Sequence, residues 1–423
     1  MDASVVDAML QAWGVGVSSD SFHHYPFYTP RFWHGMRPKA WWGLLRWGHF
    51  RISPSRWGMA VAITLFTPFN TLGALIQACF WGRRLAASKL HSPPVFIVGH
   101  WRSGTTLLHE LLVLDERLSS PSTFQCFAPE HFLVTEWFFR RFCRWMLPAK
   151  RPMDNMQTGW DRPQEDEFAL LVMGVPSPYR RLAFPNLPPV DLEYLDTEGL
   201  DEPRREAWGE PLVRFLKAVS WRTERPLVVK SPTHTGRIAT LARIFPGAKF
   251  IHLTRNPETL FPSTVRLWQS LDAVQALQLT PTSPGSSSPA LPSPESSAAA
   301  PSSATDGLKS PSEAVGLEAG NLEEYVIECL RRMYAAFHRD RNAIPAENIV
   351  DVRYEDLVAD PVAQVESIYA RLRLGDFESV RESLTRWVET EHSEYRPNLH
   401  RLPEAQATKI RTAWRDYFDR YGY

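Results

Sequence analysis

The amino-acid sequence predicts an α/β fold of three layers, in which helices cover both faces of a central parallel β-sheet. From residue 93 onward, short apolar segments rich in β-branched residues alternate with segments of helical periodicity. Strands that alternate with helices need crossover connections, and strands joined in this way run parallel. The chain has 423 residues, of which 44% are hydrophobic, so it can bury the core of one large domain or of two small ones.

The individual strands and helices follow from the apolar periodicity. The expected strands are residues 94–99, 226–230, 249–255 and 348–354. The expected helices are residues 105–114, 165–174, 233–245, 321–338 and 361–372. We therefore expect residues 91–423 to form the α/β domain and residues 1–90 to form a distinct N-terminal segment.

The N-terminal segment is rich in aromatic and basic residues and contains one long apolar stretch. Residues 57–82 carry no charge, and basic residues flank both ends. The stretch is long enough to cross a membrane, but Pro68 and Asn70 lie near its middle. Basic residues on both sides favour both ends on one membrane face. We predict membrane-associated helices in the form of a hairpin, broken at residues 67–70, that re-enters the membrane or lies on it. The alternative is an apolar helix pair packed on the globular domain.

A second unusual segment interrupts the α/β pattern. Residues 279–316 consist largely of Pro, Ser, Ala and Thr, with almost no large apolar side chains. Such a segment cannot offset its chain entropy by burial. We expect a disordered surface insertion within one domain, because the sheet needs strands from both sides of it.

Composition limits the classes of partner and compartment. Lys and Arg number 47, as do Asp and Glu, so the bulk charge indicates no nucleic-acid partner. The four cysteines are scattered, which predicts neither a disulfide framework nor a zinc site, and we expect no bound metal. This cysteine usage fits a reducing compartment, so we expect the α/β domain on the cytoplasmic face of a membrane.

A glycine-rich turn between the first strand and the first helix predicts an anion site. Gly99 and Gly104 have the spacing of the phosphate-binding loop GxxxxGK[ST], which makes the expected fold P-loop-like. Thr105 stands where the loop lysine of ATP-binding proteins belongs, and the cation has moved to Arg102. The unpaired N–H groups and the dipole of the helix favour a phosphate there. We therefore expect a 5′-phosphate group in the loop, without the lysine that reaches a γ-phosphate.

The loop sequence "GHWRSGTT" resembles the 5′-phosphosulfate loop of sulfotransferases that use 3′-phosphoadenosine 5′-phosphosulfate (PAPS), in the Arg form of the membrane-linked and Golgi-type branches. A second signature of that family is a strand that ends in Arg, with a Ser eight residues later. Arg255 and Ser263 match it, and the resemblance implies that both hold the 3′-phosphate. It spans roughly residues 93–267. The implied donor-binding residues are Gly99, Arg102, Ser103, Gly104, Thr105, Thr106, Arg255 and Ser263.

Lys230 ends the second expected strand, in "VVKSPTH", a region that resembles protein-tyrosine sulfotransferases. The resemblance implies that Lys230 neutralises charge on the bridging oxygen as the sulfuryl group leaves, together with Arg102. The carboxyl end of a parallel strand is also where α/β proteins place their ligands. The alternative for Lys230 is a surface ion pair.

The base that deprotonates the acceptor is less clear from the sequence. The stretch that matches the base-bearing segment of protein-tyrosine sulfotransferases, residues 119–127, contains no acid. Glu165 and Glu167 are the leading candidates, because an apolar neighbour on the same helix can raise a carboxyl pKa. Asp166, His131 and His234 are further candidates, and the alternative is an acidic helix start favoured by the dipole. A late basic loop with Arg396 could close over the 3′-phosphate.

These observations favour an enzyme that transfers the sulfuryl group of PAPS to a hydroxyl or amine of a lipid, glycan, peptide or small molecule, at a membrane surface. Two alternatives remain. A P-loop kinase or NTPase needs a loop lysine and a magnesium-binding carboxylate, whereas the second strand ends in Lys230. A non-catalytic membrane adaptor on the same fold predicts loss of Arg102, Lys230, Arg255 or Ser263, and all four are present.

Overall fold

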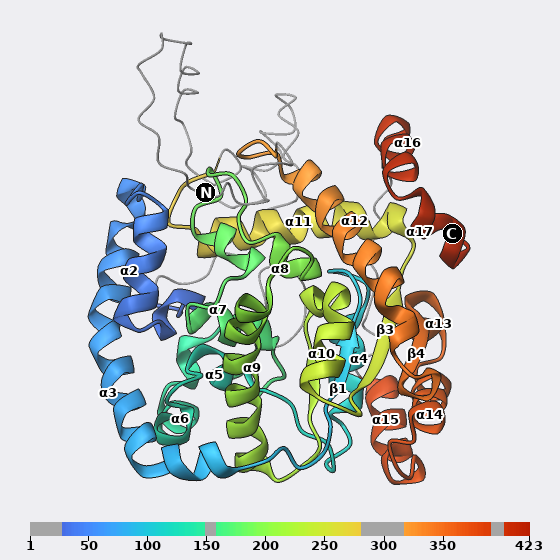
Figure 1. The fold of residues 1–423 in the computed structure, drawn as a ribbon, viewed down its shortest axis with the longest axis horizontal. Coiled ribbons are helices and arrows are strands. Elements are labelled where there is room, and N and C mark those ends of the chain that lie inside the picture. Colours follow the sequence, from blue (N-terminus) through green and yellow to red (C-terminus); the bar gives the residue numbers. More distant parts are fainter. Residues whose placement is uncertain (1–27, 149–157, 281–316, 391–401) are drawn as a thin grey trace, which may run out of the picture.

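The computed structural model describes residues 28–148, 158–280, 317–390 and 402–423. Its centre is a four-stranded parallel sheet in the order β2–β1–β3–β4 (Figure 1). The strands are β1 Val95–Val98, β2 Val228–Lys230, β3 Lys249–Thr254 and β4 Ile349–Arg353. The register pairs Val95 with Val228 and with Lys249. All four expected strands are confirmed, with ends within two residues of the expected ones.

Helices fill the connections between the strands. Before β1 lie η1 Phe32–Gly35, α2 Pro38–Trp47, η2 Pro54–Arg56 and α3 Trp57–Ala87. Between β1 and β2 lie α4 Thr105–Leu112, α5 Thr123–Phe127, α6 Phe132–Phe142, η3 Arg144–Met146, α7 Asp166–Val172, η4 Pro178–Ala183, α8 Glu193–Asp196 and α9 Glu202–Thr223. Between β2 and β3 lie η5 Pro232–Arg237 and α10 Ile238–Ile244, and between β3 and β4 lie α11 Pro257–Gln275, α12 Leu322–Asp340, η7 Arg341–Ala343 and η8 Ala346–Asn348. After β4 come α13 Tyr354–Ala359, α14 Pro361–Leu372, α15 Glu378–Thr390, α16 Glu404–Ala413 and α17 Arg415–Tyr421.

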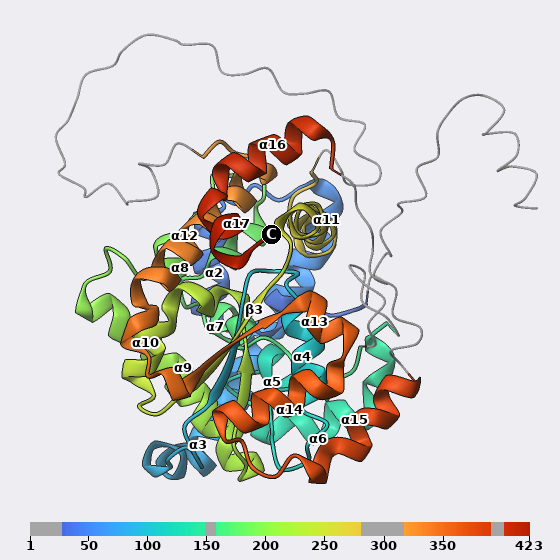
Figure 2. The same ribbon diagram turned by 90° about the vertical axis from the view of Figure 1, so that its right-hand side faces the viewer.

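The sheet separates two apolar cores because successive side chains of a strand point to opposite faces. In β1, Phe96 and Val98 join one core, together with residues of α9, α10 and α12. Val95 and Ile97 join the other, with residues of α4 and α14. Figure 2 shows these two sets of helices on either side of the strands. The expected three-layer α/β architecture is therefore confirmed.

The N-terminal region differs from the expected hairpin. Residues 57–87 form one continuous helix, α3, which passes through Pro68. Proline leaves the carbonyl of residue 64 without its helical N–H donor, and here the Thr67 hydroxyl donates to the Thr64 carbonyl at 2.9 Å. Asn70 also does not break the helix, since its amide donates to the carbonyls of His34 and Met36 at 2.7 and 2.9 Å. The prediction of a break at residues 67–70 was wrong because these side chains replace the lost bond and anchor the helix.

The described part of the N-terminal segment packs into the core of the α/β domain. Trp33 and Trp41 are fully buried and belong to the same apolar core as Phe96 of β1. The Trp33 indole N–H donates to the Gln275 carbonyl at the end of α11, at 2.6 Å. Helix α3 runs along one edge of the molecule (Figure 1). This segment therefore contributes to the core of the α/β domain as well as presenting an apolar helix.

Two predicted features fall largely on residues that the structure does not describe. The expected insertion, residues 279–316, lies outside the described residues apart from its first two. Of these, Leu279 accepts a hydrogen bond from Asn186 and donates one to Ser53, both at 2.9 Å. The late loop with Arg396 also lies outside the described part of the chain.

Candidate active site

The glycine-rich loop between β1 and α4 has a backbone conformation that favours glycine at some positions. Gly99, Arg102 and Gly104 all have positive φ, at 146°, 68° and 95°. A Cβ atom on Gly99 would lie 2.6 Å from the Leu253 carbonyl oxygen. One on Gly104 would lie 2.4 Å from the Tyr354 ring. The two glycines are therefore required by both conformation and space.

The loop leads directly into helix α4, whose first turn is the predicted place for a bound anion. Gly104 occupies the N-cap position without a capping side chain, so the first N–H groups of the helix have no acceptor from that residue. Thr105 is buried and Thr106 is half-buried in the first turn. The Ser103 hydroxyl is buried and has no hydrogen-bond partner among the residues that the structure describes. A bound phosphate oxygen could accept from groups of this kind.

Arg102 and the two residues of the second signature meet beside the loop. The Arg102 Nε donates to the Ser263 Oγ at 2.9 Å. The Arg255 Nη1 donates to the Arg102 carbonyl at 2.7 Å, and its guanidinium lies over the Tyr354 ring at 4.2 Å. Ser263 comes from α11 and Arg255 from the end of β3. The loop and the segment that carries Arg255 and Ser263 lie about 150 residues apart in the sequence and are thus brought together in the fold.

Lys230 lies on the other side of the loop, in a buried position. Its side chain is 2% exposed, which excludes the alternative of a surface ion pair. The Nζ donates to Glu165 Oε1 at 2.7 Å and to Thr106 Oγ1 at 3.3 Å. The structure therefore joins two sequence-predicted site residues, Lys230 and Glu165, at the first turn of α4.

A chain of hydrogen bonds links Glu165 back to the glycine-rich loop. The Tyr179 hydroxyl donates to Glu165 Oε2 at 2.7 Å, and the Trp101 indole N–H donates to the Tyr179 oxygen at 2.6 Å. Burial, reinforced by the charge of Glu165, raises the pKa of Tyr179 well above its usual value. Tyr179 therefore stays protonated and remains a donor to the carboxylate.

The two acids that follow Glu165 are held in buried pairs of their own. Glu167 is fully buried, and Arg237 donates to both of its oxygens, at 2.6 and 3.2 Å. Burial alone would raise the pKa of Glu167, but Arg237 lowers it below the usual value. Asp166 pairs with His234 at 2.8 Å, where both side chains are fully buried. Of the three acids, Glu165 is the one that shares a partner with the loop and α4.

The candidate base His131 lies elsewhere. Its ring packs against Phe69 and beside Gly73 of α3, and its Nδ1 is 2.9 Å from the Thr135 hydroxyl. Burial lowers its pKa to about 4. The structure thus gives His131 a place in helix packing and does not bring it to the loop residues.

Three residues of the site were missed by sequence reasoning: Trp101, Tyr179 and Arg237. A signal for Arg237 was present, since Lys230, His234 and Arg237 follow one another at spacings of four and three, and each pairs with one of the three successive acids. No local pattern marks Tyr179 as a partner of Glu165, because the contact depends on the path of the chain between α7 and η4. Within the described residues, no three His, Cys, Asp or Glu side chains are grouped so as to hold a metal.

The parallel sheet, the strand–loop–helix turn and the cations beside it define the class of α/β proteins that hold a phosphorylated ligand at a glycine-rich loop. The chain belongs to the sulfotransferase family, whose sequence profile matches residues 93–281 and 305–379. It is similar to omega-hydroxy-beta-dihydromenaquinone-9 sulfotransferase Stf3 of Mycobacterium bovis and of Mycobacterium tuberculosis. With each, 37% of 391 aligned residues are identical, over 92% of this chain and 91% of the relative.

Solved structures support the same fold. Sulfotransferase STF9 from Mycobacterium avium superposes with a TM-score of 0.56 and 17% identity, over 91% of this chain and 96% of that one. Sulfotransferase STF1 from Mycobacterium tuberculosis H37Rv gives a TM-score of 0.54 and 14% identity, over 98% of each chain. The protein is therefore a sulfotransferase by family and by fold.

Proposed function

We propose that this sulfotransferase uses PAPS as its donor and transfers the sulfuryl group to a hydroxyl of a lipid acceptor. The observation that carries the proposal is the meeting of two groups of residues at the glycine-rich loop. Arg102, Ser263 and Arg255 lie on one side, and Lys230 with Glu165 lies on the other. The first group suits two phosphates of a nucleotide, and the second suits the transfer itself.

The donor fits the groups that surround the loop. The first turn of α4, with Ser103, Thr105 and Thr106, would hold the 5′-phosphosulfate. Arg255 and Ser263 would hold the 3′-phosphate, which distinguishes PAPS from ATP. The Arg102 side chain contacts Ser263 and would add a cation beside these phosphates.

The reaction moves charge in one direction. The acceptor oxygen forms a bond to sulfur, the bond from sulfur to the bridging oxygen breaks, and its electron pair stays on the departing phosphate. Lys230 and Arg102 would stabilise that growing negative charge, and a preorganised cation in a buried site is worth far more than one in water. Lys230 is already held beside Thr106 at the start of α4.

Glu165 is the proposed base. Its carboxylate is 13% exposed, whereas the Glu167 side chain is fully enclosed by its ion pair. Glu165 would take the acceptor proton as the new bond to sulfur forms. When Lys230 turns toward the donor, Tyr179 still holds Glu165 through its second oxygen. Donor binding would therefore free one carboxylate oxygen of Glu165, while the Tyr179 hydroxyl keeps the side chain in place.

The acceptor class comes from the relatives. The Stf3 proteins are named for a hydroxylated menaquinone, which is an isoprenoid lipid. We extend that class to this chain: a long lipid with a terminal hydroxyl, presented at a membrane surface. We place the catalytic domain on the cytoplasmic side, which agrees with the free cysteines of the described residues.

The test separates donor binding from chemistry. Arg255→Ala removes charge-assisted hydrogen bonds worth roughly 1.5–3 kcal/mol, so PAPS affinity should fall by about one to two orders of magnitude. Lys230→Ala should lower turnover by about 10²-fold or more with little change in affinity, because the charge on the bridging oxygen grows mainly in the transition state. Lys249→Ala is the matched control, since that lysine lies at the opposite end of the sheet.

The measurements are PAPS affinity and transfer of labelled sulfate to a hydroxylated isoprenoid quinone. Stabilisation by ATP with magnesium, but not by 3′,5′-adenosine bisphosphate, would support the kinase alternative instead. If Lys230→Ala lowers PAPS affinity and leaves turnover unchanged, the role proposed for that lysine in the transfer step is wrong.

A further inference from the structure

Helix α3 has an exposed face that is unlike the exposed face of a soluble helix. Trp57, Val61, Leu65 and Leu72 recur at helical spacing on this face, and Leu65 is 72% exposed. No charged residue interrupts the stretch from Trp57 to Gly82. A helix on the surface of a soluble protein normally carries polar residues on its outer side. Only 28% of the most apolar part of α3 is buried within the protein.

The apolar surface continues from α3 onto the neighbouring helix α6. Phe69 of α3 contacts Phe139 of α6, and Phe139 contacts Phe138. Phe138 and Trp137 both contact Phe142 at the end of α6. We name this surface the α3–α6 face. Its exposed members are Trp57, Val61, Leu65, Phe66, Phe69, Leu72, Leu75, Phe80, Trp137, Phe138, Phe142 and Trp145.

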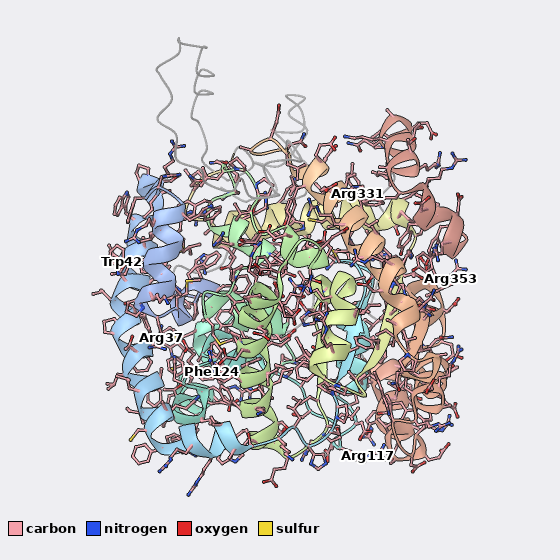
Figure 3. The ribbon with its side chains drawn as sticks, viewed as in Figure 1. Arg37, Trp42, Arg117, Phe124, Arg331 and Arg353 are labelled. Atoms are coloured by element: carbon pink, nitrogen blue, oxygen red, sulfur yellow. The ribbon has the colours of Figure 1, made fainter. Side chains whose placement is uncertain are left out.

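Basic residues surround this face. Between Tyr28 and Leu90 there are nine Lys and Arg residues and no Asp or Glu. Arg83, Arg84 and Lys89 are exposed beyond the apolar part of α3, and Arg141 and Arg144 are exposed beside Phe142. Trp42 points outward from the same edge of the molecule (Figure 3). Aromatic and apolar side chains bordered by cations are the composition of helices that lie in the interface of an anionic membrane.

The inner side of α3 shows that the helix lies along the protein and does not project from it. Asn70 binds the backbone of His34 and Met36, and Gln77 accepts from the Leu133 N–H at 2.9 Å. At Gly73, a Cβ atom would lie 2.9 Å from the Cβ of His131. A helix that crossed a bilayer would have to break these contacts and carry its buried Asn and Gln into hydrocarbon.

We infer that the α3–α6 face binds the surface of an anionic phospholipid bilayer, with α3 lying in the plane of the membrane. This deepens the membrane location in the proposed function and rests on it. A second copy of the chain fits less well, because it would bring two sets of the same basic residues together. The face also leads toward the site. The Trp160 indole N–H donates to the Cys143 carbonyl just after α6. Glu165 follows Trp160 by five residues in the sequence.

The experiment compares the full-length protein with a double variant, Leu65→Glu/Leu72→Glu. Both positions are exposed, at 72% and 58%, so the substitutions add charge to the surface without entering the core. The matched control is Ala363→Glu/Ala370→Glu, which makes the same charge change at the same spacing on exposed positions of α14. Each protein is mixed with vesicles of phosphatidylcholine alone or of phosphatidylcholine with anionic phosphatidylglycerol, and flotation is measured.

The wild type and the control should float with the anionic vesicles, and the Leu65→Glu/Leu72→Glu protein should bind them at least about tenfold more weakly. Arg83→Gln/Arg84→Gln should weaken binding to anionic vesicles and leave binding to neutral ones unchanged. Equal flotation of all variants would overturn the inference. So would a wild type that is dimeric without vesicles and becomes monomeric on Leu65→Glu/Leu72→Glu, since the face would then be a contact between copies.

A further measurement separates this inference from the proposed function. 3′,5′-Adenosine bisphosphate affinity and sulfate transfer to a short, water-soluble hydroxyl acceptor should be equal in the wild type and the Leu65→Glu/Leu72→Glu protein. If transfer persists while the wild type ignores vesicles, the docking surface is wrong and the proposed function stands. If vesicle binding behaves as expected but no hydroxyl acceptor is sulfated, the proposed function is wrong and the docking surface stands.

Discussion

Three adjacent carboxylates in the described structure have three different environments. Glu165 contacts Lys230 and Tyr179 at the edge of the loop, Asp166 contacts buried His234, and Glu167 is enclosed with Arg237. The Glu165 side chain is 13% exposed, whereas Glu167 and Arg237 form a fully buried ion pair. Position along the chain therefore says little about role here, whereas the partner of each acid says a great deal.

This difference predicts opposite effects of two matched substitutions. If Glu165 is the base, as we propose, Glu165→Gln should lower turnover by about 10²–10⁴-fold, because the amide keeps the shape of the side chain but cannot take the acceptor proton. Glu167→Gln should mainly lower the free energy of unfolding, by about 3–5 kcal/mol, because it leaves Arg237 buried without its counter-charge. Steady-state turnover and urea unfolding of both variants check this. Full turnover in Glu165→Gln would show that another residue is the base, and His234 would be the next residue to test.

At the residue scale, the sequence predicted the grouping of Arg255 and Ser263 with the loop better than it predicted the partners of the three acids. The loop and the pair Arg255 and Ser263 lie in short motifs with a fixed position after a strand, so their grouping follows from parallel topology. The choice between Glu165 and Glu167 depends on which residues fold against them. Those partners, Tyr179 and Arg237, come from segments whose path through the structure is set by tertiary packing and not by local periodicity.

At the scale of elements, strand positions were predictable because buried β-branched runs end at glycine or at charged residues. The shape of α3 was not, because Pro68 normally indicates a break. The continuity of α3 at Pro68 depends on the Thr67 hydroxyl and on a contact within the chain from Asn70 to the segment before α2. Neither can be read from the apolar periodicity, which is the same for a hairpin and for a continuous helix.

Asn70 should therefore stabilise the docking of α3 onto the rest of the protein. Asn70→Ala leaves the His34 and Met36 carbonyls without this donor in a buried position, and should lower the free energy of unfolding by about 1–3 kcal/mol. Thr71→Ala is the control, since the Thr71 hydroxyl donates only within its own helix, to Thr67, and should cost no more than about 0.5 kcal/mol. Urea unfolding measures both. Equal effects of the two changes would show that the Asn70 contacts do not anchor the helix.

For the whole molecule, buried histidines predict a loss of stability in mild acid. Burial lowers the pKa of His100 to about 3 and the pKa values of His34 and His131 to about 4. Below about pH 6.5 the unfolded chain binds protons at these rings and the folded chain does not. Stability from this source is complete above that pH and falls as the pH drops, by about 2 kcal/mol per histidine at pH 5.

Some carboxyls act in the opposite sense, because burial raises the pKa values of Asp191, Glu136, Asp196 and Asp272. Burial raises the pKa of Asp191 to about 6, so the folded state binds a proton there more readily than the unfolded state, and this residue alone would favour the fold as the pH falls through 6. Four histidines have a pKa of about 3 or 4, His338 included, and together they still leave a net loss. Urea unfolding at pH 7 and pH 5 should show it, and His131→Gln should remove roughly a quarter of the histidine contribution. Stability that is unchanged or higher at pH 5 would contradict this balance.

The continuous, outward-facing apolar side of α3 also has a kinetic consequence. A helix fixed along the domain that carries Lys230 would make the bilayer, and not the buffer, the solvent from which a lipid acceptor is drawn. The search for the acceptor then takes place in two dimensions, and its effective concentration is its mole fraction among the neighbouring lipids. Adding inert phospholipid would slow the enzyme as a competitive inhibitor does, whereas diluting the whole suspension with buffer would leave the rate of each bound molecule unchanged.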